Sequence, residues 1–267
     1  MAITLTNLHT YPIKSLQGID VLEVPVESRG LKLDRRWMIT KPDGMFITQR
    51  KYPQLALIDL KMTKKALVLE APGMSTLEIG LTENTGVTRQ VQVWDDACAA
   101  LEVSKTANQW FSDYMDMPLQ LVHMPDDTER KVEAEYNINN HITSFSDAYP
   151  FLLISEASLA DLNARLEEPV PMNRFRPNLV VSGTEAFAED TWKKIRVGEL
   201  VFHVVKPCAR CVFTTVDQKT GVKGVEPLKT LSQYRKEGAK VLFGQNLLQE
   251  TNGTIKVGDE VEVLEVK

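Results

Sequence analysis

The chain has 267 residues, 43% of them hydrophobic and 25% charged, a composition typical of a soluble globular protein with one or two domains. Its net charge of −5 argues against a general nucleic-acid-binding protein. No window approaches the roughly 18 apolar residues of a membrane span, and the N-terminus has no signal-peptide pattern, so we expect no membrane partner. Three cysteines do not make a disulfide framework, which favours a reducing, cytoplasmic location.

Short β-rich segments, separated by Gly, Pro or Asn, dominate roughly the first hundred residues. Residues 35–50 contain two such segments on either side of Pro42-Asp43-Gly44, a sequence that favours a turn. Residues 66–79 and 88–96 continue the pattern. Regular short strands of this kind indicate a β-barrel or a β-sandwich.

The hydrophobic period then changes from that of strands to that of helices. A helix is predicted between Ser104, a suitable N-cap, and Pro118, a suitable stop, because apolar residues recur there at helical spacing. Residues 155–168 and 226–236 predict two further helices, and Pro227 suits the first turn of the last one.

Two segments of the second half echo each other. Residues 195–205 and 255–266 share the pattern I-[RK]-V-G-[ED]-x-V, which predicts a strand, a tight turn and a strand in each. Two similar hairpins fit a small barrel. Residues 122–147 are polar and predict a long loop, and loops of that length are often functional. We expect two domains, over residues 1–120 and 121–267.

Cys208 and Cys211 are spaced C-x-x-C between β-rich flanks. A structural zinc site needs about four ligands, but Cys98 is the remaining cysteine and the histidines are scattered. A dithiol redox motif normally lies at a helix N-terminus, which the flanks do not predict. Two interpretations remain: a pair of buried small side chains, or a thiolate bound to a soft metal, which Lys206 and Arg210 would favour.

A second group of residues is scattered along the chain but consistent in chemical type. Cations neutralise a phosphate, a guanidinium binds it bidentately, and a hydroxyl donates to it. An asparagine amide suits the donor and acceptor edge of a pterin. Each residue alone could equally be a solvated surface group, and no P-loop, G-x-G-x-x-G or H-E-x-x-H motif is present. The candidates are Lys14, Ser15, Arg35, Arg174, Arg176 and Asn178.

These segments together resemble the MOSC family, the molybdenum-cofactor sulfurase C-terminal type domains. The chain is similar to the bacterial YcbX-type proteins and to the mitochondrial amidoxime-reducing component. The resemblance implies a β-rich α+β fold, with an N-terminal MOSC-associated β-barrel-like module followed by a MOSC β-barrel domain with a few helices. It rests on YPIKS, LDRRWMITKPDGMFITQR, FSDAYPFLLISEASLADLN, NRFRPNLVVSG, EDTWKKIRVGE, KPCARCVFTTVD, EPLKTLSQYR and FGQNL, in family order.

The resemblance implies that the chain binds molybdenum cofactor, a pyranopterin with a terminal phosphate and a dithiolene-held molybdenum. Cys211 would be the catalytic cysteine and metal ligand, and Cys208 its neighbour. Asp147 would lie close to the metal and could relay protons, although it also suits a turn or cap. The mitochondrial relatives have hydroxyl residues after this Asp, where this chain has Ala148 and Tyr149. The implied cofactor-binding residues are Lys14, Ser15, Arg35, Arg176, Asn178 and Cys211.

The resemblance also implies an activity, the two-electron reduction of small N-hydroxylated compounds by oxo transfer. The chain has no C-x4-C-x2-C ferredoxin motif, so we expect a separate iron–sulfur or flavin protein to supply electrons. One alternative is a carrier of cofactor or sulfur, with a persulfide on Cys211 and no turnover. Another is a cofactor-free β protein that retains the motif. Pyridoxal phosphate binding is a further expectation at the level of the family.

Overall fold

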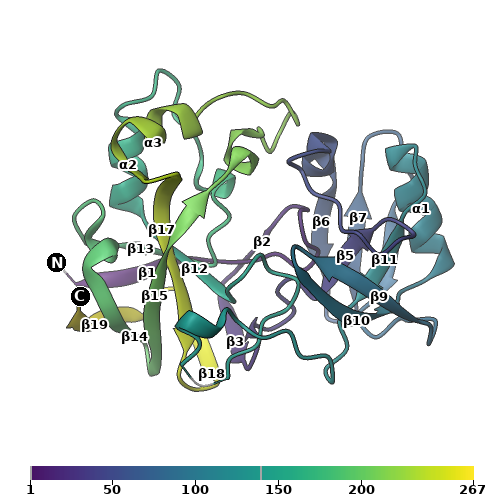
Figure 1. Ribbon diagram of the computed structural model, residues 1–267, viewed down its shortest axis with the longest axis horizontal. Helices are drawn as coiled ribbons and strands as arrows, with labels where there is room; N and C mark the ends of the chain where they lie inside the picture. The colour runs from purple at the N-terminus through teal and green to yellow at the C-terminus, as the bar shows by residue number, and fades with distance from the viewer. Residues whose placement is uncertain (1, 139) are drawn as a thin grey trace.

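The computed structural model describes residues 2–138 and 140–267, which fold into two lobes (Figure 1). The described residues contain 19 β-strands and three α-helices, so the expected β-rich α+β class is confirmed. Short 3-10 helices connect several strands, and they are η1 (Pro53–Leu57), η2 (Ala134–Tyr136), η3 (Met172–Arg174), η4 (Ala188–Thr191) and η5 (Val212–Thr215).

Seven strands close a barrel in the left-hand lobe of Figure 1. Their order is β12-β13-β1-β19-β14-β15-β17, and β17 pairs back with β12. The β12–β13 pair is parallel and the others are antiparallel. The bounds are β1 (Ile3–Thr10), β12 (Phe151–Ser155), β13 (Leu179–Ser182), β14 (Trp192–Val197), β15 (Leu200–Arg210), β17 (Lys240–Gln249) and β19 (Glu260–Val266), with β2 (Ile19–Val21) and β16 (Lys236–Glu237) extending the sheet.

The first strand of the chain belongs to this barrel. Strand β1 lies between β13 and β19, with Leu5 opposite Val181 and Ile3 opposite Val261. Leu5 and Leu8 are both buried in the barrel core. Figure 1 shows the purple β1 crossing the left-hand lobe among green and yellow strands. The division into two domains, over residues 1–120 and 121–267, stays a prediction. Strand β1 belongs to the first of these ranges but pairs with strands of the second.

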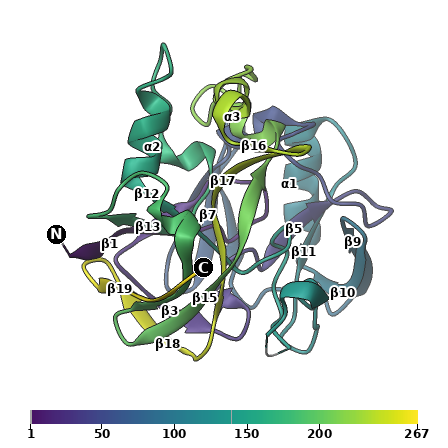
Figure 2. The same ribbon diagram turned by 60° about the vertical axis from the view of Figure 1, so that its left-hand side comes forward.

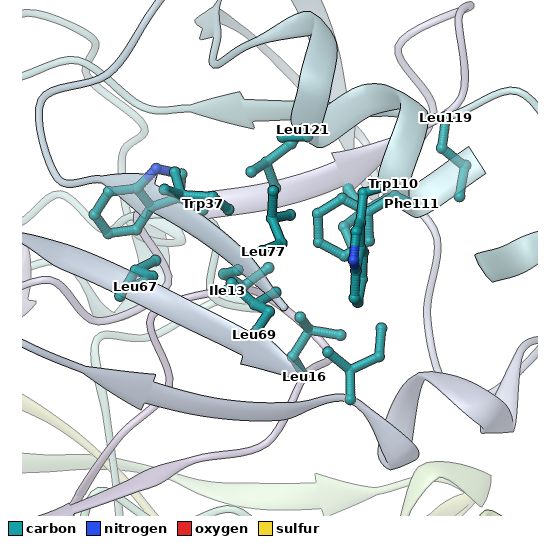
Figure 3. Packing of buried hydrophobic residues seen from close by; sticks show 14 of the residues in the cluster. Ile13, Leu16, Trp37, Leu67, Leu69, Leu77, Trp110, Phe111, Leu119 and Leu121 are labelled. Carbon is teal, nitrogen blue, oxygen red and sulfur yellow. The ribbon is translucent and has the colours of Figure 1, made fainter. Parts of the chain in front are cut away.

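The second lobe packs two small sheets and one helix around a core of its own. Trp37 and Phe111 are fully buried and share one cluster with the leucines of β7 (Figure 3). The sheets are β5-β11-β10-β9 and β6-β7-β8, and a third sheet, β18-β3-β4, lies beside the barrel. The bounds are β3 (Glu23–Glu27), β4 (Gly30–Leu31), β5 (Trp37–Thr40), β6 (Asp59–Met62), β7 (Ala66–Glu70), β8 (Leu77–Gly80), β9 (Thr88–Val93), β10 (Asp96–Glu102), β11 (Gln120–His123) and β18 (Gly253–Lys256).

All three predicted helices form. Helix α1 (Lys105–Met115) begins where the Ser104 side chain accepts a hydrogen bond from the Ala107 N–H, the expected N-cap. Helix α2 (Glu156–Asn163) ends before the predicted residue 168, because prolines follow closely in the sequence and disfavour helix. Helix α3 (Leu228–Tyr234) follows Pro227 directly. Figure 2 shows α2 and α3 together at one end of the barrel.

Of the two similar hairpins that the sequence predicts, one forms and the other does not. Strands β14 and β15 form the first echo hairpin, but β18 pairs with β3 while β19 pairs with β1 and β14. The Val257 N–H donates to the Leu22 carbonyl at 2.8 Å, and the turn at Gly258 then leads the chain into the barrel.

Around Gly44 the predicted turn forms, but the following segment makes only isolated bridges from Met45 and Phe46.

The place of β1 in the barrel gives a stability prediction. Leu5→Ala should lower the free energy of unfolding by about 2–5 kcal/mol, because Leu5 is fully buried and its loss leaves a cavity. The measurement is urea denaturation followed by circular dichroism. Asn7→Ala, on an exposed position of the same strand, is the control and should change the value by less than about 0.5 kcal/mol. Equal losses in the two variants would contradict the role of β1.

Candidate functional site

One cavity is lined by residues from both lobes and from widely separated parts of the sequence. Its walls come from the loop after β1, the segments on either side of β5, the loop before β12, the residues before β13 and the end of β15. It brings together all the residues that the resemblance implied, namely Lys14, Ser15, Arg35, Asp147, Arg176, Asn178 and Cys211. Arg174 does not line the cavity, because it pairs with Asp217 at 2.9 Å.

The cavity is strongly cationic in a chain whose net charge is −5. Its lining has five cationic side chains and one carboxylate, that of Asp147. Like charges gathered in a concave site produce a positive potential that attracts anionic ligands. The five cations are Lys14, Arg35, Arg50, Arg176 and Arg210.

Tyr11 separates two of these cations. The Cζ atoms of Arg35 and Arg176 lie 4.3 and 4.1 Å from the centroid of its ring, a cation–π arrangement. Burial, with the like charge of Arg35 nearby, lowers the pKa of Arg176 to about 10, so it remains protonated at neutral pH. The Tyr11 ring packs directly against Gly18. A Cβ at residue 18 would overlap the ring, so only glycine leaves room for it there.

Three residues of the cavity have a left-handed backbone although none is glycine. The φ angles are 67° at Ser15, 50° at Arg35 and 57° at Arg176. Such a conformation costs about 1–2 kcal/mol per residue and persists where the surrounding structure imposes it. Strained residues of this kind cluster at functional sites, which supports a binding role for this cavity.

Asn178 is buried behind Arg35, and its amide is fully hydrogen-bonded. Its Oδ1 accepts from Arg35 at 3.0 Å and from the Leu152 N–H at 3.3 Å. Its Nδ2 donates to the His9 carbonyl at 3.1 Å and to Asp34 at 3.2 Å. The amide has no free donor or acceptor, so we expect it to position Arg35. Direct contact between Asn178 and a cofactor stays a prediction.

Lys14 and Asp147 form an ion pair at the cavity wall, with 2.5 Å between Nζ and Oδ1. Burial lowers the pKa of Lys14 to about 8, although the Asp147 charge raises it in part. Burial would raise the pKa of Asp147, but the charge and hydrogen bond of Lys14, with Arg50 and the Trp94 N–H, hold it well below its usual range. At neutral pH, Asp147 is therefore ionised and accepts the hydrogen bonds of Lys14 and Trp94.

The two cysteines of the C-x-x-C motif have different surroundings. Arg210 donates to the Cys208 sulfur at 3.0 Å and to the Phe175 carbonyl at 2.6 Å. The Cys211 thiol is half-buried at the cavity, directly before η5, and does not cap that helix. We expected Lys206 to favour a thiolate at these cysteines. This expectation is wrong, because the Lys206 Nζ donates to Glu133 at 2.6 Å instead.

The donor set fits the molybdenum cofactor that the resemblance implied. Arginines suit a phosphate, and a thiolate suits a soft metal. The Nε of Arg210 is buried and has no hydrogen-bond partner in the described residues, so it could donate to an anion placed there. No group of three or more His, Cys, Asp or Glu side chains in the described part of the chain could hold a metal ion. A metal would therefore depend on ligands that its own cofactor supplies, besides a thiolate.

Two residues of the site were not predicted from the sequence. Arg50 lines the cavity, and the Trp94 ring nitrogen donates to Asp147 at 3.2 Å. No spacing or composition signal marks either residue, because long-range packing brings them to the site. Ala148 has no hydroxyl and the Tyr149 hydroxyl donates to Glu133 at 2.9 Å, which leaves neither side-chain hydroxyl for the cavity.

Comparison with known proteins agrees with the resemblance. Residues 2–118 match the MOSC N-terminal beta barrel domain, and residues 140–262 match the MOSC domain. Mitochondrial amidoxime-reducing component 1 of Homo sapiens is 36% identical over 98% of this chain and 83% of its own length. Mitochondrial amidoxime reducing component 2 of Rattus norvegicus is 36% identical over 97% of this chain and 82% of its own.

A solved structure, the YUAD protein from Bacillus subtilis, aligns with 98% of this chain and 94% of its own at a TM-score of 0.42 and 10% identity. No helix in the residues that the structure describes is long and apolar enough to cross a membrane.

The two domain matches, with 36% identity over 98% of the chain, show that the chain belongs to the MOSC-domain family, together with the amidoxime-reducing components.

Proposed function

We propose that this protein binds molybdenum cofactor in the cationic cavity and reduces small N-hydroxylated compounds, with electrons from a separate iron–sulfur or flavin protein. The observation that carries the proposal is the convergence of seven predicted site residues on one cavity with five cations and one carboxylate. The names of the relatives, amidoxime-reducing components, support the choice of substrate class.

Distinct parts of the cavity would hold distinct parts of the cofactor. Arg35 and Arg176, fixed on either side of Tyr11, would bind its phosphate. Cys211 would supply the protein sulfur ligand to the metal. When bound, the cofactor would supply the two-electron oxo-transfer chemistry that this reduction needs.

The ion pair at the cavity wall would handle protons. Reduction of an N–OH group to N–H with release of water consumes two protons and two electrons. Lys14, with a pKa of about 8, can give up a proton near neutral pH and regain one, and Asp147 orients its ammonium group. The electrons come from the separate donor protein.

Two further expectations stay predictions. Pyridoxal phosphate would need a lysine amine, but Lys14 of the cavity already donates to Asp147 and to the Phe145 carbonyl. A cytoplasmic location is untested by the fold, and the relatives are named mitochondrial.

Removal of the proposed metal ligand tests the function. Cys211→Ala should lower the rate of benzamidoxime reduction, with a supplied electron donor, by more than the roughly 10–100-fold loss typical of outer-shell ligand partners. Cys98→Ala, which changes a buried cysteine that does not line the cavity, is the matched control and should retain activity. Full activity in Cys211→Ala would refute the assignment. Cofactor bound by wild type without any turnover would instead favour the carrier alternative.

The low pKa of Lys14 predicts a pH dependence. The ammonium is present below about pH 8 and is lost above it, so kcat/KM should fall as pH rises through 8, by roughly 10-fold at pH 9. Lys14→Arg stays charged throughout this range and cannot give up a proton, so it should be slower than wild type at every pH and should lack the fall. A pH–rate profile of both proteins from pH 6 to 9.5 is the measurement. The same profile in both would contradict the role of Lys14.

A further inference from the structure

A second hollow lies beside the cavity, and we call it the Trp94 groove. It shares Thr48 and Arg50 with the cavity, so the two are continuous at these residues. It is built by the turn after β5, the segment leading to η1, and Trp94 in the turn between β9 and β10. The side chains that define it are Lys41, Phe46, Arg50, Lys51, Tyr52 and Trp94.

The groove presents an aromatic surface. The rings of Phe46 and Trp94 meet edge to face, with 5.1 Å between their centroids. Trp94 is 39% exposed, whereas Trp37, Trp110 and Trp192 are buried. Its backbone has a φ of 56°, a strained conformation for a large residue at the turn between two strands. An exposed tryptophan in a strained turn is a candidate ligand contact, because strain of this kind concentrates at binding sites.

The groove is also cationic. Lys41, Arg50 and Lys51 line it, and no carboxylate does. The Cζ of Arg50 lies 3.9 Å from the centroid of the Trp94 ring, a cation–π contact that keeps the guanidinium beside the aromatic surface. The nearest acidic residue in the turn, Asp43, accepts a hydrogen bond from the Met45 N–H at 2.9 Å. Cations beside stacking rings suit an anionic aromatic ligand and repel a cationic one.

The groove is coupled to the reacting end of the cavity. The Trp94 ring nitrogen donates to Asp147, and Asp147 pairs with Lys14. A molecule whose N-hydroxylated group lies in the cavity would pass Thr48 and Arg50 and place its remote part against Trp94. Contacts with remote parts of a substrate contribute to the rate by positioning the reacting group.

We propose that the Trp94 groove is a substrate subsite for a planar aromatic group that carries an anionic substituent. This inference rests on the proposed reductase function for the identity of the reacting group. The groove then favours carboxylated or phosphorylated aromatic N-hydroxylated compounds over neutral ones of the same shape.

The first test compares two amidoximes of nearly equal size, 4-carboxybenzamidoxime and its neutral amide, 4-carbamoylbenzamidoxime. Wild type should show a kcat/KM about 2- to 5-fold higher for the carboxylate, within the range expected for an exposed ion pair. Lys41→Gln/Lys51→Gln should lower this preference, because Arg50 is then the one groove cation left, and should not change the rate with the neutral amide. The control is Lys193→Gln/Lys256→Gln, which changes the charge equally at two exposed positions that do not line the groove. No preference in wild type, or an undiminished one in the groove variant, would overturn the proposal.

The second test reads binding without turnover. Titration with 4-carbamoylbenzoate should quench the fluorescence of the exposed Trp94, and neutral terephthalamide should quench it less. Trp94→Phe should lose the quenching. Quenching by 4-carbamoylbenzoate in a protein that reduces neither amidoxime would support the subsite and refute the reductase function. Equal quenching in wild type and Trp94→Phe would refute the subsite even if both amidoximes are reduced.

Discussion

Repulsion between cations that face one cavity is the constraint on which the site depends. The surrounding chain offsets it with groups that belong to distant segments. Tyr11 lies between Arg35 and Arg176, Asp34 pairs with Arg35, and Asn178 holds Arg35 through a fully used amide. Because these neighbours fix the cations before any ligand arrives, an anionic ligand would meet a preorganised site and lose little binding energy to reorganisation.

The fold explains how these segments meet. Strand β1 closes the barrel of the second half of the chain, and the loop that follows it enters the other lobe. Lys14 and Ser15 on that loop therefore meet Arg176, which precedes β13 of the barrel, and Asp147, which precedes β12. The Leu5 and Leu8 contacts that stabilise the barrel also place the first wall of the cavity.

The sequence predicted the fold class, the three helices and several strands, such as β7, β9, β14 and β15, because capping residues, prolines and hydrophobic periods are local signals. It did not predict that β18 and β19 separate, since pairing partners depend on the whole sheet. For the site, the sequence pattern alone left two interpretations of the C-x-x-C pair, and the resemblance selected Cys211. Arg50 and Trp94 carried no local signal, and neither did the left-handed backbone at Ser15.

The central claim is that the preorganised cations bind an anionic molybdenum cofactor. The most direct measurement is molybdenum by elemental analysis, with pterin fluorescence after denaturation, on protein purified from a host that makes the cofactor. We expect near-stoichiometric metal and pterin in wild type and a large loss of both in Arg35→Gln/Arg176→Gln, but not in the exposed control Arg165→Gln/Arg196→Gln. Absence of both from wild type, or equal amounts in the cavity variant, would contradict it.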